Sequence, residues 1–430
     1  MPEQYEPKDG GQDSIDPFKD NPGLAQFDRS DPIALLGYCI ESMEAANRLG
    51  YDFIAVVPPG YEQALEKDGV RAIPWAFDRI NEKSHHLALQ LTEHGVRLAV
   101  PLYEETVEWA GALNARFFGN PRMFNRSLLF RDKAMMKRNA QMNGIRVGLF
   151  EEVDGPESIV KFFHRVNDAL GRVGEDEPEP VHVKPLSAAG SVGHRVIRSA
   201  ADVEQVPAEA FPCLIESHLS GQEFSCEVFV HRGRILFMNI NEYIHLGYSQ
   251  LLPPSEVLEK HRERIREQVQ RLIRAFDIRF GIMHPEYFLD TEGAFHFGEV
   301  ANRIPGGHIF ELIERAYGFD PFAGQILCSD PLVPDEEAEA FFPDERAGKR
   351  GHAGNLLVYP RKRTISELSV PAELHEEPYY VNHDLFEPVT PKVAERAGFG
   401  DHYGKVNFFG DDPARLKEVL LRFEQMDFYV

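Results

Sequence analysis

Residues 182–193, HVKPLSAAGSVG, combine a lysine with a run of small residues of the kind that can cradle phosphate groups. In common nucleotide-binding loops the lysine follows the glycines, whereas Lys184 precedes them and lies in the apolar, strand-like context PVHVKP. Taken alone, SAAGSVG is equally typical of an ordinary hairpin loop. The pattern therefore indicates a site that carries its cation on a strand and a flexible loop directly after it.

Two glutamates further along the chain are candidate metal ligands. Glu286 and Glu299 each interrupt a hydrophobic strand, and a short turn at residues 290–293 separates the two strands. Antiparallel pairing would bring the two carboxylates side by side, where they would repel unless they share a cation. Mg²⁺ prefers a few carboxylates together with phosphate oxygens. The alternative is that the glutamates form salt bridges with Arg279 or Arg303.

The overall charge limits the classes of partner. The chain has 430 residues and a formal net charge of -23, which argues against general affinity for nucleic acid or an anionic membrane. Any phosphate site must then be a local group of basic residues in an acidic protein. The N-terminus has no apolar signal region, and no apolar run approaches transmembrane length. We therefore expect a cytoplasmic protein.

The first part of the chain alternates between strand and helix patterns. Residues 1–30 are rich in Pro, Gly, Asp and Gln and are expected to form a tail with little fixed structure. IALLGYC and YDFIAVVP predict buried strands on either side of a helix, which is typical of a parallel α/β domain over residues 31–120. The G-x-G-x-x-G pattern of a dinucleotide site is missing after the first strand. SLLFRDKAMMKRNAQMNG predicts one further helix, closed by Gly144.

The remainder predicts an α+β region. FPCLIESHL and EFSCEVFVHRGRILFMNI show the alternation of antiparallel sheet, and EVLEKHRERIREQVQRLIRAF predicts a helix between them and the two acidic strands. Residues from about 331 begin with an acidic, proline-containing linker and end in a strand, GKVNFFG, and a helix.

Four motifs now come together in one order. FRDKAMM with Lys133, Lys184 with SAAGSVG, IESHLSGQEFS, and HPEYFLD followed by FGEVANRIPGG occur in the order found in ATP-grasp enzymes. The chain resembles the carboxylate–amine ligases of that superfamily, and among them the L-amino-acid ligases that make dipeptides. The resemblance implies an α/β and α+β ATP-grasp fold. It assigns an N-terminal domain at 31–120, a core at 121–330 with a mobile lid at about 145–215, and a C-terminal subdomain at 331–430 that completes the core.

The resemblance also assigns the ATP-binding residues. Lys133 matches the first ATP lysine of the family, although Lys137 competes with it one helical turn away. Lys184 would hold the α- and β-phosphates while the small-residue loop closes over the others. Glycines let backbone N–H groups approach phosphate oxygens, and serines add hydroxyl donors. The expected loop donors are Ser187, Gly190, Ser191 and Gly193.

The hinge IESHL should lie along the adenine. In this interpretation Glu216 lies near the exocyclic amine, and the backbone at His218 and Leu219 contacts the ring. Glu223 fits the ribose-binding glutamate of the family, with Glu227 as the alternative.

The resemblance makes Glu286 and Glu299 the ligands of Mg²⁺ or Mn²⁺. Many family members carry E-x-N-x-R, in which the asparagine is a further ligand, but this chain reads EVANR and places Ala301 there. Asn302 should point to the opposite face if the segment stays extended. Arg303 keeps its family spacing and should stabilise charge on the transferred phosphoryl group or the acyl-phosphate.

IPGGHIF, which follows Arg303, resembles the loop that holds the substrate carboxylate in related ligases. The backbone N–H groups of Gly306 and Gly307 could serve this purpose. His284 and His308 are candidates to line the same pocket, although a lone histidine is more often structural.

We therefore expect an ATP-dependent ligase that joins a small carboxylate, such as an amino acid, to an amine through an acyl-phosphate, releasing ADP and phosphate. Lys184, Glu299 and Arg303 are its expected catalytic residues. Two alternatives stay open: an ATP-grasp enzyme that uses the acyl-phosphate otherwise, in a formate-dependent or carboxylase reaction, and a non-catalytic nucleotide-binding module. The sequence defines neither the substrates nor the oligomeric state, so a homodimer is also open.

Overall fold

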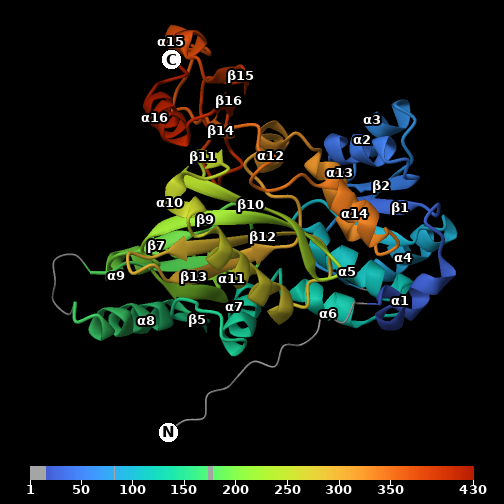
Figure 1. Cartoon of the computed structure of the whole chain (residues 1–430). Coiled ribbons are helices and arrows are strands. Elements are labelled where there is room, and N and C mark those ends of the chain that lie inside the picture. Colours follow the sequence, from blue (N-terminus) through green and yellow to red (C-terminus); the bar gives the residue numbers. More distant parts are fainter. Residues whose placement is uncertain (1–15, 82, 173–177) are drawn as a thin grey trace.

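A computed structural model describes residues 16–81, 83–172 and 178–430. Residues 1–15 of the predicted tail and residues 174–177 of the acidic segment GEDEPEP lie outside this part. The described chain forms a four-stranded parallel sheet, a four-stranded antiparallel sheet and an eight-stranded antiparallel sheet. Figure 1 shows the N-terminal part in blue and cyan on one side of the large sheet, with the red C-terminal part above it. The mixed architecture confirms the predicted fold class.

The N-terminal sheet is parallel, as the alternating pattern predicted. Its strand order is β3–β2–β1–β4, formed by Ala72–Pro74, Phe53–Val57, Ile33–Leu36 and Leu98–Pro101. Every residue of β1 and β2 is buried, which is typical of parallel strands covered on both faces. The helices of this domain are α2 (Ile40–Arg48), α3 (Glu62–Lys67), α4 (Ser84–Glu93) and α5 (Thr106–Phe117).

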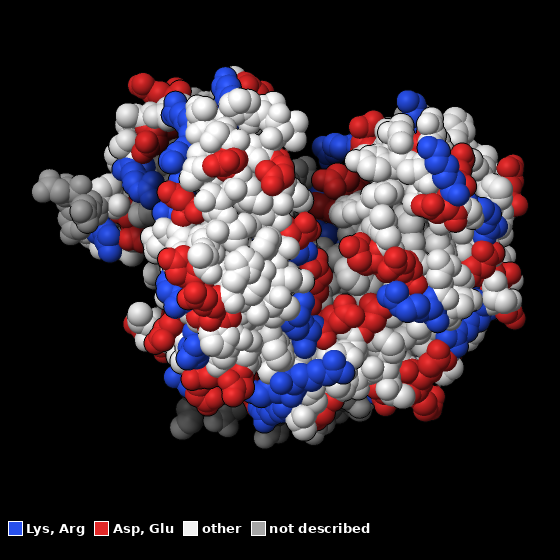
Figure 2. Space-filling view, turned by 90° about the horizontal axis from the view of Figure 1, so that it is seen from above, with Lys and Arg blue, Asp and Glu red and all other residues white. Residues whose placement is uncertain are grey.

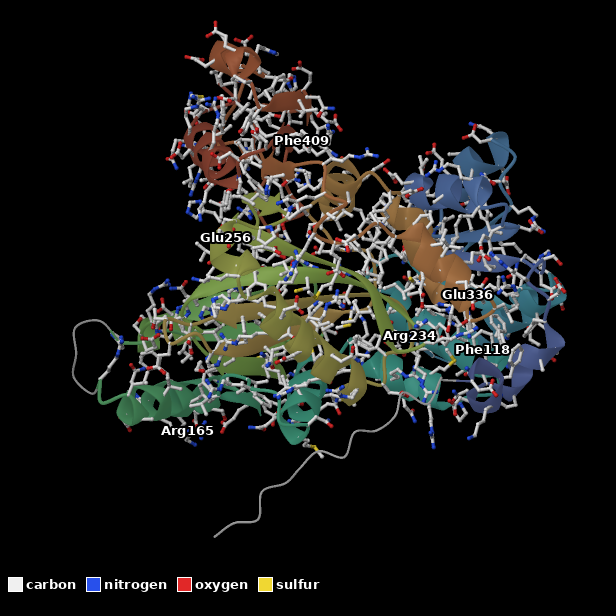
Figure 3. All side chains as sticks on the ribbon, viewed as in Figure 1. Phe118, Arg165, Arg234, Glu256, Glu336 and Phe409 are labelled. Atoms are coloured by element: carbon white, nitrogen blue, oxygen red, sulfur yellow. The ribbon has the colours of Figure 1, made fainter. Side chains whose placement is uncertain are left out.

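The start of the described chain departs from the expected unstructured tail. It forms helix α1, Pro17–Asp20, and the 3₁₀ helix η1, Pro22–Gln26. Leu24 is fully buried, and the Gly23 N–H donates a hydrogen bond of 2.9 Å to the Phe118 carbonyl. Figure 3 labels Phe118 close to this segment. One leucine docked at the end of α5 fixes a segment whose polar composition suggested a loose chain.

The single helix expected before Gly144 is two helices. They are α6, Arg122–Leu128, and α7, Lys133–Met142. Asp132 starts the second helix, because its side chain accepts a hydrogen bond of 2.8 Å from the Met135 N–H and so caps the N-terminus of α7. Gly144 follows α7 with a left-handed φ of 71°, which suits a glycine at a helix end.

The four-stranded antiparallel sheet forms the region expected to be the lid. Its order is β5–β8–β6–β7, formed by Phe150–Val153, Cys213–Ser217, Val181–Pro185 and Arg195–Ile197. Val181 and Val183 pack into a small core with residues of α8 (Pro156–Ala169). Because side chains alternate along a strand, His182 and Lys184 face the other way. The short elements α9 (Ala200–Val203) and η2 (Ala208–Ala210) complete this region.

The eight-stranded sheet unites the predicted core and the C-terminal part. Its order is β13–β12–β9–β10–β11–β14–β16–β15. In that order the strands are Phe295–Ala301, Phe280–Leu289, Gln222–His231, Arg234–His245, Ser249–Leu252, His352–Leu357, Gly404–Gly410 and Tyr380–Leu385. Pairing of β11 with β14 makes the last three strands a direct continuation of the core sheet.

Helices pack on this sheet from several directions: α13 contacts β9 and β12, whereas α12 and α16 contact β14. None of the helices in the described ranges is long and apolar enough to cross a lipid bilayer. The helices of this half are α10 (Glu256–Glu259), α11 (Arg262–Ala275), α12 (Ile309–Tyr317), α13 (Pro321–Ser329), α14 (Asp335–Phe341), α15 (Ala372–Glu376) and α16 (Pro413–Glu424).

A fully buried ion pair joins the N-terminal domain to the large sheet. Arg97, just before β4, makes two hydrogen bonds of 2.8 Å to the carboxylate of Asp330, just after α13, and both side chains are completely buried. The same guanidinium donates to the carbonyls of Asp31 and Arg29, and Tyr51 donates to Asp330. Both charges are therefore well solvated by protein groups, which a buried ion pair requires.

Replacing Arg97 by methionine should lower the free energy of unfolding by about 3–5 kcal/mol, because Asp330 would remain buried without its cation. Urea unfolding followed by circular dichroism measures the change. Arg71→Met is the matched control, since Arg71 and Asp52 form an exposed pair on the same domain whose loss should cost about 0–1 kcal/mol. Equal losses in the two variants would contradict the structural importance of the buried pair.

Candidate active site

A buried carboxylate brings the lid, helix α7 and the large sheet together. Glu216 on β8 is only 6% exposed and forms ion pairs with Lys184 of β6 and, at 2.8 Å, with Lys137 of α7. Burial alone would raise the pKa of Glu216, but the two lysines outweigh it and hold that pKa well below its usual range. Lys137 also donates a hydrogen bond of 2.8 Å to the Gly298 carbonyl of β13. Glu216 is therefore ionised and central to the site.

The structure separates the roles of the two candidate lysines of α7. Lys133 donates from Nζ to the Ala188 carbonyl at 2.7 Å and lies 3.2 Å from a carboxylate oxygen of Glu299. Its own N–H donates to the Leu186 carbonyl. Lys133 thus contacts the small-residue loop, whereas Lys137 pairs with Glu216.

The small-residue loop runs from β6 to β7, and residues 186–193 are called the phosphate loop below. Gly190, Ser191 and Gly193 have left-handed φ angles of 61°, 61° and 73°. A side chain on Gly190 would meet no atom within 4 Å, so the space on that side of its Cα is open, and Ser187 is exposed. Open, left-handed backbone next to Lys184 can turn N–H groups toward an anion.

The two candidate metal ligands lie on adjacent antiparallel strands, as the turn between them predicted. Glu286 is on β12 and Glu299 on β13, with Pro285 opposite Val300 in the register. Neither carboxylate pairs with an arginine: Arg279 pairs with Asp277 and Asp20, and Arg303 pairs with Glu104. Burial favours the protonated form of Glu299, but Lys133 and Lys184 lower its pKa to about 2.

Glu223 completes a crowded group of carboxylates. It lies on β9 opposite Phe288 of β12, in the strand pair that carries Glu286. Burial, and after it the charge of Glu286, raise the pKa of Glu223 to about 8. The charges of Glu286 and Glu299 thus oppose ionisation of Glu223, Lys184 offsets them in part, and a further cation would favour the ionised form.

The alternative ribose ligand, Glu227, lies in the interior. It is completely buried and accepts hydrogen bonds from Ser225 at 2.9 Å, from Asn239 at 2.6 Å and from the His284 ring at 3.1 Å. Its carboxylate is therefore fully engaged by protein, which leaves Glu223 as the candidate for the ribose.

His284 links Glu227 to a candidate metal ligand. Its Nε2 lies 3.5 Å from a carboxylate oxygen of Glu286. Burial lowers the pKa of His284, but hydrogen bonds to Glu227 and Glu286 reverse the effect and raise it to about 9. His284 thus contacts these two glutamates, while His308 contacts Glu311 and Lys405, and a pocket shared by the two histidines stays a prediction.

The loop that follows Arg303 is held by buried amides. Gln250 and Asn355 donate hydrogen bonds of 2.7 and 2.8 Å to the Gly307 carbonyl, and Gly307 has a left-handed φ of 64°. His308 is also left-handed, with a φ of 58°, and precedes α12. The backbone of Gly306 and Gly307 is thereby fixed in a turn suited to a ligand carboxylate.

Arg303 is held by a residue that the sequence did not single out. It donates from Nε to Glu104 at 3.0 Å, and the other oxygen of Glu104 accepts a hydrogen bond of 2.9 Å from Arg131. Glu104 follows β4, and the carboxyl end of a parallel strand is where α/β domains place binding residues. The position of Glu104 after a predicted parallel strand was therefore the sequence feature that could have identified it. Figure 2 shows a groove between the N-terminal part and the rest of the molecule, with charged side chains of both signs on its walls.

The hinge carries an unexpected row of imidazoles. His218 contacts His182 at 3.0 Å, and His182 contacts His194 at 2.9 Å, with the rings stacked in both pairs. Burial, then the charges of His194 and Lys184, lower the pKa of His182 to about 4. His182 is therefore neutral near pH 7, and it lies on the same face of the lid as Lys184. Leu219 follows His218 and lies against Gly148.

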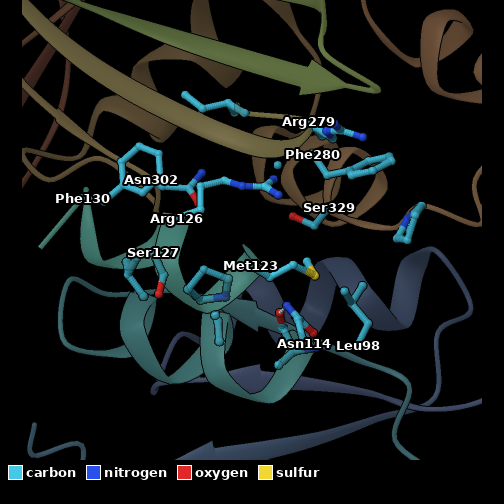
Figure 4. Close-up of a pocket in the computed structure, with 18 of the residues that line it drawn as sticks. Leu98, Asn114, Met123, Arg126, Ser127, Phe130, Arg279, Phe280, Asn302 and Ser329 are labelled. Carbon is cyan, nitrogen blue, oxygen red and sulfur yellow. Dashed lines mark hydrogen bonds between the residues drawn. The ribbon is translucent and has the colours of Figure 1, made fainter. Parts of the chain in front are cut away.

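Asn302 points away from the carboxylates, as the spacing predicted. Its side chain donates a hydrogen bond of 2.7 Å to the Ile282 carbonyl and lines a cavity of about 100 Å³, shown in Figure 4 with Arg126, Ser127 and Phe130. Ala301 pairs with His284 at the end of β13. The strand thus offers no amide in the position where many relatives supply a third metal ligand.

The geometry fits both a nucleotide and a divalent cation. The crowding of Glu223 and Glu286 favours an added cation, and the open backbone at Gly190 leaves room for phosphate oxygens. Within residues 16–81, 83–172 and 178–430 there is no cluster of three or more His, Cys, Asp or Glu side chains that could hold a metal unaided. Two carboxylates leave coordination positions for phosphate and water, which Mg²⁺ usually retains.

Comparison with known proteins agrees with these features. The sequence profile of the ATP-grasp domain matches residues 203–311. The L-arginine-specific L-amino acid ligase of Bacillus subtilis is 26% identical over 284 residues, covering 62% of this chain and 61% of that protein. A D-alanine–D-alanine ligase of Geobacillus thermodenitrificans is 26% identical over 215 residues, covering 45% and 55%. The chain therefore spans less than two thirds of either relative.

Solved structures share the fold over nearly the whole chain. The L-amino acid ligase of Bacillus licheniformis superposes with a TM-score of 0.72 at 17% identity, covering 94% of this chain and 99% of that one. The N5-carboxyaminoimidazole ribonucleotide synthetase of Thermotoga maritima gives 0.67 at 18% identity, covering 93% and 99%. ATP and Mg²⁺ or Mn²⁺, the predicted cofactors, are those that ATP-grasp ligases use. Residues 203–311 thus match the ATP-grasp domain, and the chain as a whole resembles carboxylate–amine ligases in sequence and fold.

Proposed function

We propose that this protein is an ATP-dependent ligase that joins a small carboxylate, such as an amino acid, to an amine. The carboxylate is activated as an acyl-phosphate, and ADP and phosphate are released. The observation that carries the proposal is the contact of Lys133 with both the phosphate loop and Glu299, beside Lys184 and Glu286. This arrangement gathers cations and metal-type carboxylates where the terminal phosphates of ATP would lie.

In this proposal the lid and the large sheet hold ATP between them. Lys184 and Lys133 neutralise phosphate charge, and Ser187, Gly190, Ser191 and Gly193 supply donors from the phosphate loop. The carboxylate of Glu216 is occupied by two lysines, so adenine recognition at the hinge relies on the backbone of His218 and Leu219. Glu223 binds the ribose.

Glu286 and Glu299 would hold the divalent cation. Bound Mg²⁺ supplies charge neutralisation on the phosphate oxygens. The protein contributes the two carboxylates and the nearby His284, which contacts both Glu286 and Glu227 and so fixes Glu286.

The chemistry follows from the placement of the loops. The substrate carboxylate, held by the backbone of Gly306 and Gly307 near His308, attacks the γ-phosphorus, and the bond to the ADP oxygen breaks. The amine then attacks the acyl carbon, phosphate leaves, and the amine loses a proton. Arg303 stabilises the charge on the transferred phosphoryl group and on the acyl-phosphate. Catalysis depends mainly on position and charge, as in phosphoryl transfer generally.

The first prediction concerns ATP binding. Lys184→Ala should weaken the binding of a non-hydrolysable ATP analogue with Mg²⁺ by about 10- to 100-fold, because a charge-assisted contact to phosphate is lost. Isothermal titration calorimetry measures this. Lys161→Ala, an exposed lysine on α8 of the same lid, is the control and should bind normally. Unchanged affinity in Lys184→Ala would remove Lys184 from the nucleotide site.

The second prediction concerns turnover and products. Once a phosphate-release screen of carboxylic acids and amines has identified a substrate pair, Glu299→Gln should reduce turnover by about 10²–10³-fold. Affinity for the ATP analogue should change far less, because the hinge and Glu223 are untouched. Glu292→Gln, in the exposed turn between β12 and β13, serves as control. Ion-exchange separation of nucleotides should yield ADP, and stoichiometric AMP with pyrophosphate would refute the acyl-phosphate route.

The third prediction concerns Glu104. Glu104→Gln should lower kcat by about 10- to 100-fold, because Arg303 loses the ionic partner that sets its position. The affinity for the ATP analogue should stay within about 2-fold, since among the described residues the Glu104 side chain pairs with Arg131 and Arg303, which are not proposed to hold the adenine, the ribose or the α- and β-phosphates. The neighbouring Glu105 is exposed, so Glu105→Gln is the matched control. A normal kcat in Glu104→Gln would show that the pair with Arg303 is only structural.

A further inference from the structure

A segment of the C-terminal part lies directly against the phosphate loop. The Phe399 N–H donates a hydrogen bond of 2.9 Å to the Gly190 carbonyl. At Gly398 the backbones approach so closely that a side-chain Cβ would lie 2.7 Å from the same carbonyl oxygen and 2.8 Å from Cγ2 of Val192. These segments are far apart in the sequence, and their contact is between backbone atoms. We call residues 396–401 the clasp.

The clasp is a shaped loop with its own internal support. The carboxylate of Asp401 accepts hydrogen bonds of 2.7 and 3.0 Å from the N–H groups of Ala397 and Gly398. Tyr359 donates a hydrogen bond of 2.7 Å to the Phe399 carbonyl. The backbone that touches Gly190 is therefore fixed from both sides.

Arg396 anchors this loop in an aromatic box. Its guanidinium carbon lies 3.9 Å from the ring centre of Tyr359, 4.7 Å from that of Tyr248 and 5.1 Å from that of Phe399. It also donates to the Tyr248 hydroxyl at 2.6 Å and to the Gly398 carbonyl at 3.1 Å. Among the described residues its Nη2 is buried and has no hydrogen-bond partner. The cation is thus held by ring faces and by the clasp itself, which ties the clasp to the large sheet.

The phosphate loop is consequently held from two sides. On the core side Lys133 contacts the carbonyls of Leu186 and Ala188. On the other side the clasp contacts the carbonyl of Gly190, which has a left-handed φ of 61° and open space only where a side chain would lie. Directly after the clasp, the ring of His402 lies 5.5 Å from that of His308 in the proposed carboxylate loop. The clasp therefore adjoins both ends of the proposed phosphoryl transfer.

We propose that the clasp fixes the phosphate loop over the terminal phosphates and excludes water from the acyl-phosphate, with Arg396 as its positioning residue. The exclusion of water from an acyl-phosphate rests on the proposed function, whereas the fixing of the phosphate loop by the clasp does not. If water enters, its oxygen attacks the acyl-phosphate, phosphate leaves, and the original carboxylate is regenerated. The net reaction is then ATP and water to ADP and phosphate, with no amide formed.

Hydrogen exchange in the full chain without ligands tests the hold on the loop. Arg396→Met should speed the exchange of amides in residues 187–193 by about 10-fold, because the anchored loop opens more often. Arg415→Met is the matched control: Arg415 lies 5.0 Å from the ring centre of Tyr379 in the same C-terminal part and contacts Glu377 there. It should leave the phosphate loop unchanged. Equal exchange at 187–193 in both variants and the native protein would overturn the proposal.

The unfolding midpoint of Arg396→Met shows whether this variant folds normally. A second variant keeps the test decisive if it does not. Gly398→Ala keeps the aromatic box but places a methyl group against the Gly190 carbonyl, so it should also speed exchange at 187–193. If Arg396→Met is misfolded, normal exchange in Gly398→Ala overturns the proposal by itself.

The ratio of ADP to amide formed tests the exclusion of water. With a substrate pair in hand, Arg396→Met should raise this ratio several-fold over the native protein, while Arg415→Met keeps the native ratio. A merely structural role would lower both products in proportion, and an unchanged ratio would overturn the shielding role. Failure of the proposed function would instead appear as no ATP-analogue binding by the native protein, which leaves the exchange result intact.

Discussion

The site depends on one buried negative charge. A carboxylate removed from water is costly unless cations and hydrogen bonds replace its hydration, and Glu216 obtains this from Lys137 and Lys184. The three residues belong to β8, α7 and β6, so satisfying one charge also sets the angle between the lid and the helix beside it. Lys137 extends the constraint to β13 through the Gly298 carbonyl. Lys184 and Glu299 then face the same space because their supporting elements cannot shift independently.

Local sequence patterns were sufficient to predict much of the fold and part of the candidate site. The parallel N-terminal sheet follows from short, wholly apolar strands, and the neighbouring positions of Glu286 and Glu299 follow from a turn between two strands. Alternation along an extended segment also predicted that Asn302 faces away, and its bond to the Ile282 carbonyl confirms this. These features depend on residues close together in the sequence, where the period of the backbone decides which face a side chain takes.

Other features required contacts that no local pattern encodes. Glu104 and Arg303 meet only because the N-terminal domain docks on the large sheet, and Glu227 was a plausible ribose ligand until its burial was known. The imidazole row joins strand, loop and hinge residues, and the clasp reaches Gly190 from the far end of the chain. Within the predicted tail, residues 17–20 and 22–26 are helical instead, because one buried leucine outweighs a polar composition. These contacts depend on tertiary packing, which decides between alternatives that the sequence leaves open.

The strand order of the large sheet also sets the sequence of events during synthesis. Strand β11 pairs on one side with β10, which precedes it, and on the other with β14, residues 352–357, which leave the ribosome much later. Until then Leu251, whose buried core partners are residues 356 and beyond, and one row of backbone N–H and C=O groups of β11 have no cover. An open strand edge is where chains join one another by mistake. A nascent chain stalled before residue 352 would therefore be the form of this protein most in need of a chaperone.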